Sequence, residues 1–200
     1  SMPAKITAET GMDALTHALE ALASTRANYV SDILATQSAI DIMETLPIAY
    51  ENGTDMHARE IMLQASMVAG MAFTNVSLGI VHSMAHTLGG MFHVAHGLAD
   101  AILLPYVIRY NSSDAKAKEV YDTFAKKVGA ENLYEAVEAL NKKLNIPSCL
   151  QEVIPDEAAF VEKLDEMAAL AKADGCTKTN PIIPELEGFK ELFMKAYKGE

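Results

Sequence analysis

The sequence contains no tryptophan and only two cysteines, Cys149 and Cys176, in 200 residues. Two cysteines cannot form the disulfide framework of a small secreted domain, and without a secretory segment they favour a reducing cytoplasm. Positive charge is also scarce, because 16 Lys and Arg stand against 27 Asp and Glu, for a net charge of −11. A chain this acidic has no general attraction to nucleic-acid phosphates or anionic lipid, so we expect neither partner.

Charged side chains are missing altogether from Ile61 to Ala99. A helix that spans a bilayer needs about 20 mostly apolar residues, but this stretch is interrupted by Gln64, Asn75 and several glycines. We therefore interpret it as buried core rather than as a membrane segment. Half of all residues are hydrophobic, which is enough for a sizeable core, and we expect a single domain over residues 1–200.

Apolar residues recur at helical spacing along the whole chain, and no alternating strand pattern of useful length is present. The spacing predicts helices near residues 14–22, 30–47, 55–73, 81–88, 98–110, 121–128, 133–140, 160–170 and 186–197. Pro47 and the turn at Gly53 are expected to end the second helix, and Asp55 is placed to cap the third. The predicted fold class is all-α.

Four of the six histidines lie in the uncharged stretch: His82, His86, His93 and His96. A buried imidazole without a partner is costly, and a metal ion is one such partner. His82 and His86 are four residues apart and share a helix face, as do Asp13 and His17. A carboxylate with imidazoles is a ligand set for Zn²⁺ or Fe²⁺ with an open coordination position.

Spacing alone leaves several alternatives open. It does not choose among the four histidines, and Asp13 with His17 could equally be a surface i, i+4 pair. His93 lies close to an expected loop, so its direction is undetermined. His57 stands among charged residues and is interpreted as solvated.

Three separated segments resemble the C-terminal, metal-binding domain of the iron-dependent (group III) alcohol dehydrogenases. They are GMDALTHALE from Gly11, GMAFTN from Gly70 continuing in LGIVHSMAHTLG from Leu78, and HGLADA from His96. A weaker similarity, CTKTNP, begins at Cys176. The letters HSMAH are most like those of the alcohol dehydrogenase half of bifunctional aldehyde–alcohol dehydrogenases or of a related primary-alcohol enzyme.

The resemblance implies a multi-helix bundle of the dehydroquinate-synthase-like type and a function. It implies that one divalent metal ion, Fe²⁺ or Zn²⁺, is held by Asp13, His17, His82 and His96. It places His86 near the nicotinamide and the substrate as a candidate proton relay, and Phe73 and Cys176 near the substrate pocket. The metal would then polarise the oxygen of a small primary alcohol or aldehyde while hydride passes to or from NAD or NADP.

The chain has no glycine-rich pyrophosphate loop behind a strand, and Ser1 before Met2 looks like a cloning remnant. We therefore expect that the dinucleotide-binding domain is cut off, that this piece is inactive alone, and that its exposed apolar surface favours a homo-oligomer. Two alternatives remain: a zinc enzyme of the glycerol dehydrogenase or dehydroquinate synthase type, and a non-catalytic helical oligomerisation module with packed histidines. Metal content separates the last from the others.

Overall fold

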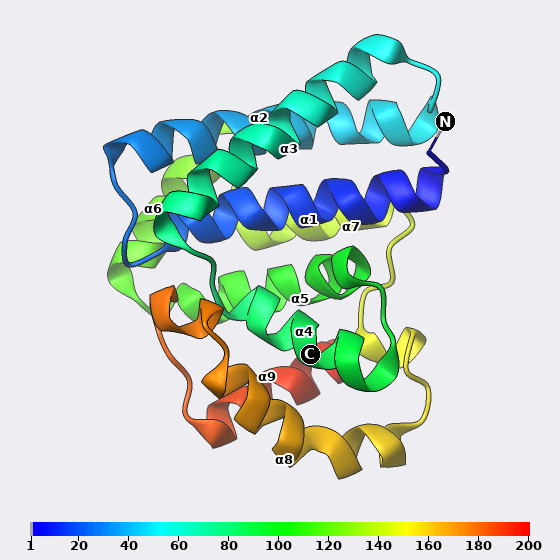
Figure 1. Cartoon of the computed structure of the whole chain (residues 1–200), viewed down its shortest axis with the longest axis vertical. Helices are drawn as coiled ribbons and strands as arrows, with labels where there is room; N and C mark the ends of the chain where they lie inside the picture. The colour runs from blue at the N-terminus through cyan, green and yellow to red at the C-terminus, as the bar shows by residue number, and fades with distance from the viewer. Residues whose placement is uncertain (1) are drawn as a thin grey trace.

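The computed structural model describes residues 2–200, and this part of the chain contains helices and no β-strand (Figure 1). The all-α prediction is therefore confirmed. The α-helices are α1 (Ala4–Ala23), α2 (Tyr29–Glu51), α3 (Met56–Val76), α4 (Ile80–Phe92), α5 (His96–Asn111), α6 (Ala115–Lys127), α7 (Leu133–Lys143), α8 (Glu157–Ala173) and α9 (Leu186–Lys198). Two short 3₁₀ helices, η1 (Leu150–Glu152) and η2 (Cys176–Thr179), interrupt the later connections.

Helix α1 runs through the middle of the molecule (Figure 1). It packs against α2 and α3 on one side and against α5 on the other, while α4 packs against α5 and α8. Met12, Leu15 and Leu19 of α1 are almost completely buried, as a helix covered on several sides requires. Some polar residues of this helix, such as Thr16 and Glu20, are therefore buried and must find partners inside the protein.

Two prolines lie inside helices, although the sequence predicts that one of them, Pro47, helps to end its helix. Pro47 does not end α2, which continues to Glu51, and Pro105 lies within α5. Each proline removes one backbone hydrogen bond. The neighbouring residues Leu46 and Ala49 are fully buried in α2, so tertiary packing keeps the helix in place.

The uncharged stretch is only partly buried. Most of its α4 portion lies in the core, but Leu63, Met67 and Met71 on the outer face of α3 are 73%, 60% and 51% exposed. The interpretation of the whole stretch as core is wrong for this face, because α3 faces its neighbours with small residues such as Ala65 and Ala69. Within residues 2–200 no single helix is long and apolar enough to cross a membrane, and α3 with α4 meets such a test only as a pair bent by 105°.

The segment that follows α8 fixes the position of α4. Thr177 donates a hydrogen bond to Ser83 (2.7 Å), and Thr179 donates to the Leu78 carbonyl oxygen (2.6 Å). The side-chain oxygen of Asn180 accepts from the backbone N–H of Ile80 (3.2 Å) at the first turn of α4. A distant part of the chain thus holds the N-terminus of the helix that carries His82.

Candidate functional site

Helix α1 contributes a row of polar side chains that contacts α4 and α5. Asp13 and His17 are one turn apart, and their Oδ1 and Nε2 atoms are 3.4 Å apart. Glu20 lies a further turn along and is 6% exposed. Spacings of three and four residues place all three on one helix face, so the predicted Asp13–His17 pair belongs to a larger polar row.

Helix α4 adds His82, which is 2% exposed. Its Nδ1 donates to Oε2 of Glu20 (2.6 Å), and its Nε2 lies 3.5 Å from Oδ1 of Asp13. The other Glu20 oxygen accepts from the backbone N–H of Val81 (2.8 Å). Glu20 therefore caps α4 and fixes the ring of His82 with Nε2 toward Asp13, as a carboxylate does for a metal-binding histidine.

Gly79 precedes α4 and leaves room for this arrangement. A Cβ atom at this position would lie 2.7 Å from Oε1 of Glu20 and 2.7 Å from Oδ1 of Asn180. These are the two side-chain oxygens that accept from the first N–H groups of α4. Any larger residue here would displace the groups that orient His82.

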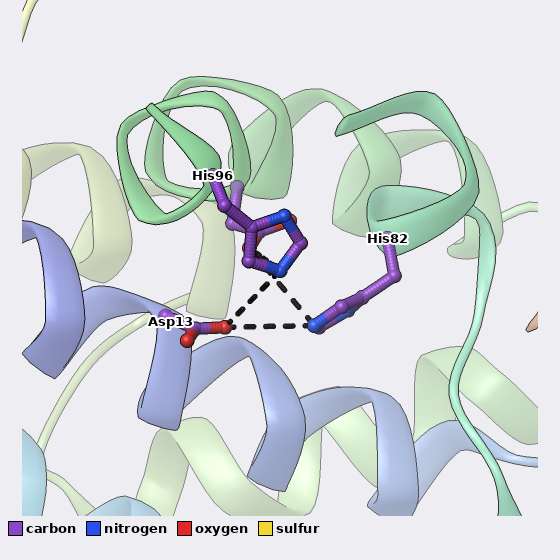
Figure 2. A group of neighbouring side chains, drawn as sticks. Asp13, His82 and His96 are labelled. Carbon is purple, nitrogen blue, oxygen red and sulfur yellow. Dashed lines mark ion pairs between the residues drawn. The ribbon is translucent and has the colours of Figure 1, made fainter. Parts of the chain in front are cut away.

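Helix α5 begins with His96, whose Nε2 lies 3.7 Å from Oδ1 of Asp13. One turn later, Oδ2 of Asp100 lies 3.2 Å from the same Nε2 and 3.9 Å from Nε2 of His82. Gly97 lets α5 approach α1 this closely, because a Cβ there would overlap the backbone oxygen of Glu9. Three helices thus converge on one point, and Figure 2 shows Asp13, His82 and His96 facing one another.

The polar atoms at this point lack hydrogen-bond partners. Nε2 of His82, Oδ1 of Asp13 and both carboxylate oxygens of Asp100 are buried without one. Two donors bound to one ion at 2.0–2.2 Å lie about 3.0 to 4.2 Å apart, depending on the angle between them. The carboxylate–imidazole distances among Asp13, His82, His96 and Asp100, 3.2 to 3.9 Å, fall in that range, and their donor atoms all lie within 4.8 Å of one another. The predicted ligand His17 is not part of this group and contacts it through Oδ1 of Asp13, 3.4 Å from its Nε2. The grouped residues therefore fit a divalent metal ion.

Burial is the largest influence on the pKa values of the cluster, and the charges of neighbouring groups oppose or reinforce it. Burial alone would lower the pKa of His82, but Glu20, Asp13 and Asp100 raise it to about 11. His17 behaves oppositely, since burial lowers its pKa to about 4 and the charge of Asp13 offsets this only in part. Burial raises the pKa of Asp100 well above its usual range. A cation bound among Asp13, Glu20 and Asp100 would favour the ionised form of each carboxylate.

A second group of side chains lies beside the first. Nδ1 of His86 lies 2.8 Å from Oδ2 of Asp174, and the other Asp174 oxygen accepts from the backbone N–H of Cys176 (2.8 Å). The His86 ring stacks on His96 with centroids 5.5 Å apart. The side chains of His86 and His96 are 46% and 43% exposed, so the site opens to the surface on this side.

The remaining predicted residues are distributed around this centre. Phe73 stacks on the ring of His17 with centroids 4.5 Å apart, and His17 stacks on His82 at 4.6 Å. Cys176 is half-buried beside Asp174 and does not reach the cluster of Asp13. His93 caps α4 in a left-handed conformation (φ 56°), exposed and outside both groups, and His57 is exposed as predicted.

Sequence reasoning missed three carboxylates, Glu20, Asp100 and Asp174. The first two had a signal, because Glu20 is seven residues after Asp13 and Asp100 is four after His96, which are same-face spacings. Asp174 follows α8 and meets His86 across 88 residues of sequence. No local pattern predicts that contact.

Comparison with known proteins gives a consistent result. Residues 7–197 match the model of the Fe-containing alcohol dehydrogenase family, C-terminal. The chain is 43% identical, over its whole length, to an NADPH-dependent butanol dehydrogenase from Clostridium saccharobutylicum, of which it covers 53%. It is 36% identical over 99% of its length to the bifunctional aldehyde–alcohol dehydrogenase AdhE from Escherichia coli, of which it covers 25%.

The fold comparison agrees. The structure of an iron-containing alcohol dehydrogenase from Thermococcus thioreducens superposes with a TM-score of 0.94 at 35% identity, covering all of this chain and 52% of that one. The chain thus spans about half the length of the butanol dehydrogenase and of this solved structure. The multi-helix bundle expected from the resemblance is confirmed.

Proposed function

We propose that this chain supplies the metal site of an enzyme that interconverts a primary alcohol and its aldehyde. The premise is that the chain belongs to the Fe-containing alcohol dehydrogenase family and corresponds to its C-terminal part. The observation that carries this proposal is the set of buried, unpartnered donor atoms of Asp13, His82 and Asp100, which converge from three helices. Polar groups buried in this way are costly unless a ligand satisfies them.

Asp13, His17, His82 and His96 are the proposed ligands of one Fe²⁺ or Zn²⁺ ion. When bound, such an ion supplies Lewis acidity toward the oxygen of an alcohol or aldehyde. Imidazole with carboxylate accepts both metals, so the proposal covers both. Nε2 of His17 lies 3.4 Å from Oδ1 of Asp13, and the His17 ring is held in place because it stacks on both Phe73 and His82.

His86 is proposed to move the proton that alcohol oxidation releases. Its Nδ1 lies 2.8 Å from Oδ2 of Asp174, and a neutral ring that donates Nδ1–H to this carboxylate presents Nε2 as a proton acceptor. Its ring lies against His96 on the open side of the site, where substrate and nicotinamide would enter. Phe73, which covers His17, and the half-buried Cys176 are proposed to line the substrate pocket on either side.

The nicotinamide cofactor, NAD or NADP, is proposed to bind on the same open side. The printed name of the butanol dehydrogenase specifies NADPH for that protein. Because this sequence has no glycine-rich dinucleotide loop, we expect the 200-residue chain tested alone to bind metal without oxidising alcohols. Both cysteines are free, which supports the proposed cytoplasmic location, and the exposed apolar face of α3 supports a homo-oligomer.

Metal analysis of the chain tests the proposal. The metal-free chain is reconstituted anaerobically with Fe²⁺ or Zn²⁺, desalted and analysed for bound metal. We expect about one ion per chain in the wild type and in His57→Ala, which removes an exposed histidine outside the cluster, and loss of metal in Asp13→Ala and His82→Ala. A wild-type chain that retains no metal would support packed histidines and a non-catalytic module.

A further inference from the structure

We propose that Asp100 is a direct ligand of the metal ion, so that the site holds its ion through two carboxylates, one from α1 and one from α5. The inference rests on the proposed function, because it concerns the same metal site. It adds a ligand that the resemblance did not select and that the sequence reasoning passed over. It also makes the donor set richer in oxygen than one carboxylate with imidazoles.

The first observation is the burial of Asp100 without a partner. Its side chain is 0% exposed, and neither carboxylate oxygen has a hydrogen-bond partner. Aspartate is almost never fully buried unless it is paired or coordinates a metal. Within the described residues, its only ion-pair contacts are with the Nε2 atoms of His82 and His96. Asp100 is therefore aimed at the nitrogens proposed to bind the metal.

The second observation is which nitrogen of His96 it contacts. A carboxylate that orients a metal-binding histidine usually accepts a hydrogen bond from the ring nitrogen that does not bind the metal, as Glu20 does from Nδ1 of His82. Asp100 lies instead 3.2 Å from Nε2 of His96, the nitrogen that also faces Asp13. If Nε2 binds the metal it carries no proton and cannot donate to Asp100. Two lone pairs at this distance are repulsive unless a cation lies between them.

The third observation is the absence of a fixed positive charge. The ion pairs of Asp13 and Asp100 within residues 2–200 involve histidines and no lysine or arginine. The distances of Asp100 Oδ2 to the two imidazole nitrogens, 3.2 and 3.9 Å, both match donors that share one ion. A divalent ion with Asp13 and Asp100 as ligands would form a centre with no net charge.

This ligand set has a consequence for metal preference. Carboxylate oxygens suit harder cations such as Mn²⁺, whereas imidazole suits Zn²⁺. Replacing Asp100 by asparagine removes the charge and keeps the shape. We expect Asp100→Asn to weaken Mn²⁺ binding more than Zn²⁺ binding.

The test is a titration of the metal-free chain with Co²⁺, whose visible absorption reports coordination number and donor type. We expect Asp100→Asn to bind Co²⁺ at least tenfold more weakly than the wild type, with a stronger and shifted visible band because a donor is lost. The control is Asp32→Asn, which changes a carboxylate with a buried unpartnered oxygen on α2 that belongs to neither group of potential metal ligands. It should retain wild-type affinity and spectrum, and circular dichroism verifies the fold of each variant.

The outcomes separate the two proposals. A wild-type chain that binds no Co²⁺ overturns the metal site itself and this inference with it. A wild-type chain that binds Co²⁺, with an Asp100→Asn variant of equal affinity and unchanged spectrum, overturns the role of Asp100 alone. If the variant does not fold, a crystal structure of the wild type with Co²⁺ decides: an Asp100 oxygen at about 2.0–2.2 Å from the ion supports direct ligation, and one held only through water refutes it.

Discussion

Glu20 offers the sharpest test of how the fold prepares the site. It touches no proposed substrate or cofactor, yet one oxygen holds Nδ1 of His82 and the other caps α4 through Val81. In Glu20→Gln one oxygen becomes an NH₂ group, so one of these two N–H donors faces another donor. The shape is preserved, and the loss is electrostatic.

The magnitude follows from the contacts. A hydrogen bond to a charged group contributes about 1.5–3 kcal/mol, and losing the carboxylate behind a metal-binding histidine typically weakens metal binding about 10–100-fold. We therefore expect Glu20→Gln to bind Co²⁺ or Zn²⁺ about 10–100-fold more weakly, and the metal-free protein to unfold about 1.5–3 kcal/mol more easily.

The assay is a chelator-competition titration together with denaturant unfolding of the metal-free chain. The matched control is Glu9→Gln, which lies on the same helix at the same 6% exposure but outside the metal cluster. It should leave metal affinity unchanged. Wild-type affinity in Glu20→Gln, or an equal loss in Glu9→Gln, would refute the role assigned to Glu20.

Three further predictions concern helix approach, the support of α4 and metal removal. Gly97→Ala should destabilise the chain by about 1–3 kcal/mol and weaken metal binding, because the backbone oxygen of Glu9 cannot rotate away from the new Cβ. The control is Gly90→Ala, whose new Cβ would meet nothing within 4 Å. It should stabilise α4 by about 0.5–1 kcal/mol, measured by denaturant unfolding. Asn180→Ala should cost about 1–3 kcal/mol by leaving the N–H of Ile80 and the side-chain oxygen of Asn111 unpaired, while exposed Asn75→Ala should cost little. Metal at 100 times its Kd should stabilise the chain by about 2.7 kcal/mol, measured as a rise in Tm that EDTA abolishes; an unchanged Tm on metal addition would contradict this.

The helices follow from local patterns wherever apolar spacing, caps and turns agree. Asp55 caps α3 as predicted, and Pro147 and Pro155 lie in loops. Two predictions failed because tertiary packing cannot be seen in a local pattern. Pro47 stays inside α2 because packing outweighs one lost hydrogen bond. The bare outer face of α3 looks like core in a sequence because hydropathy does not say which neighbours cover it.

For the site, spacing predicts which residues share a helix face but not which helices meet. Asp13 with His17 was readable, and so in principle were Glu20 and Asp100 at intervals of seven and four. The choice of His82 and His96 among four histidines came from the resemblance. The contact of His86 with Asp174 depends on how η2 and the end of α8 pack on α4, and such long-range packing has no signature in either segment alone.

The charge pattern of the sequence and the geometry of the site are connected. The uncharged stretch contains no lysine or arginine and contributes His82, His86 and His96 to the site. Helices α1 and α5 bring Asp13, Glu20 and Asp100 to His82. Buried carboxylates need a counter-charge nearby, and this part of the fold offers no fixed one. The counter-charge must therefore come from solution, as a proton or as a metal ion. The proposed metal ion would satisfy the lone pairs of Asp13, His82, His96 and Asp100 at once, whereas protons would have to satisfy them in pairs, because each proton bridges only two of these atoms.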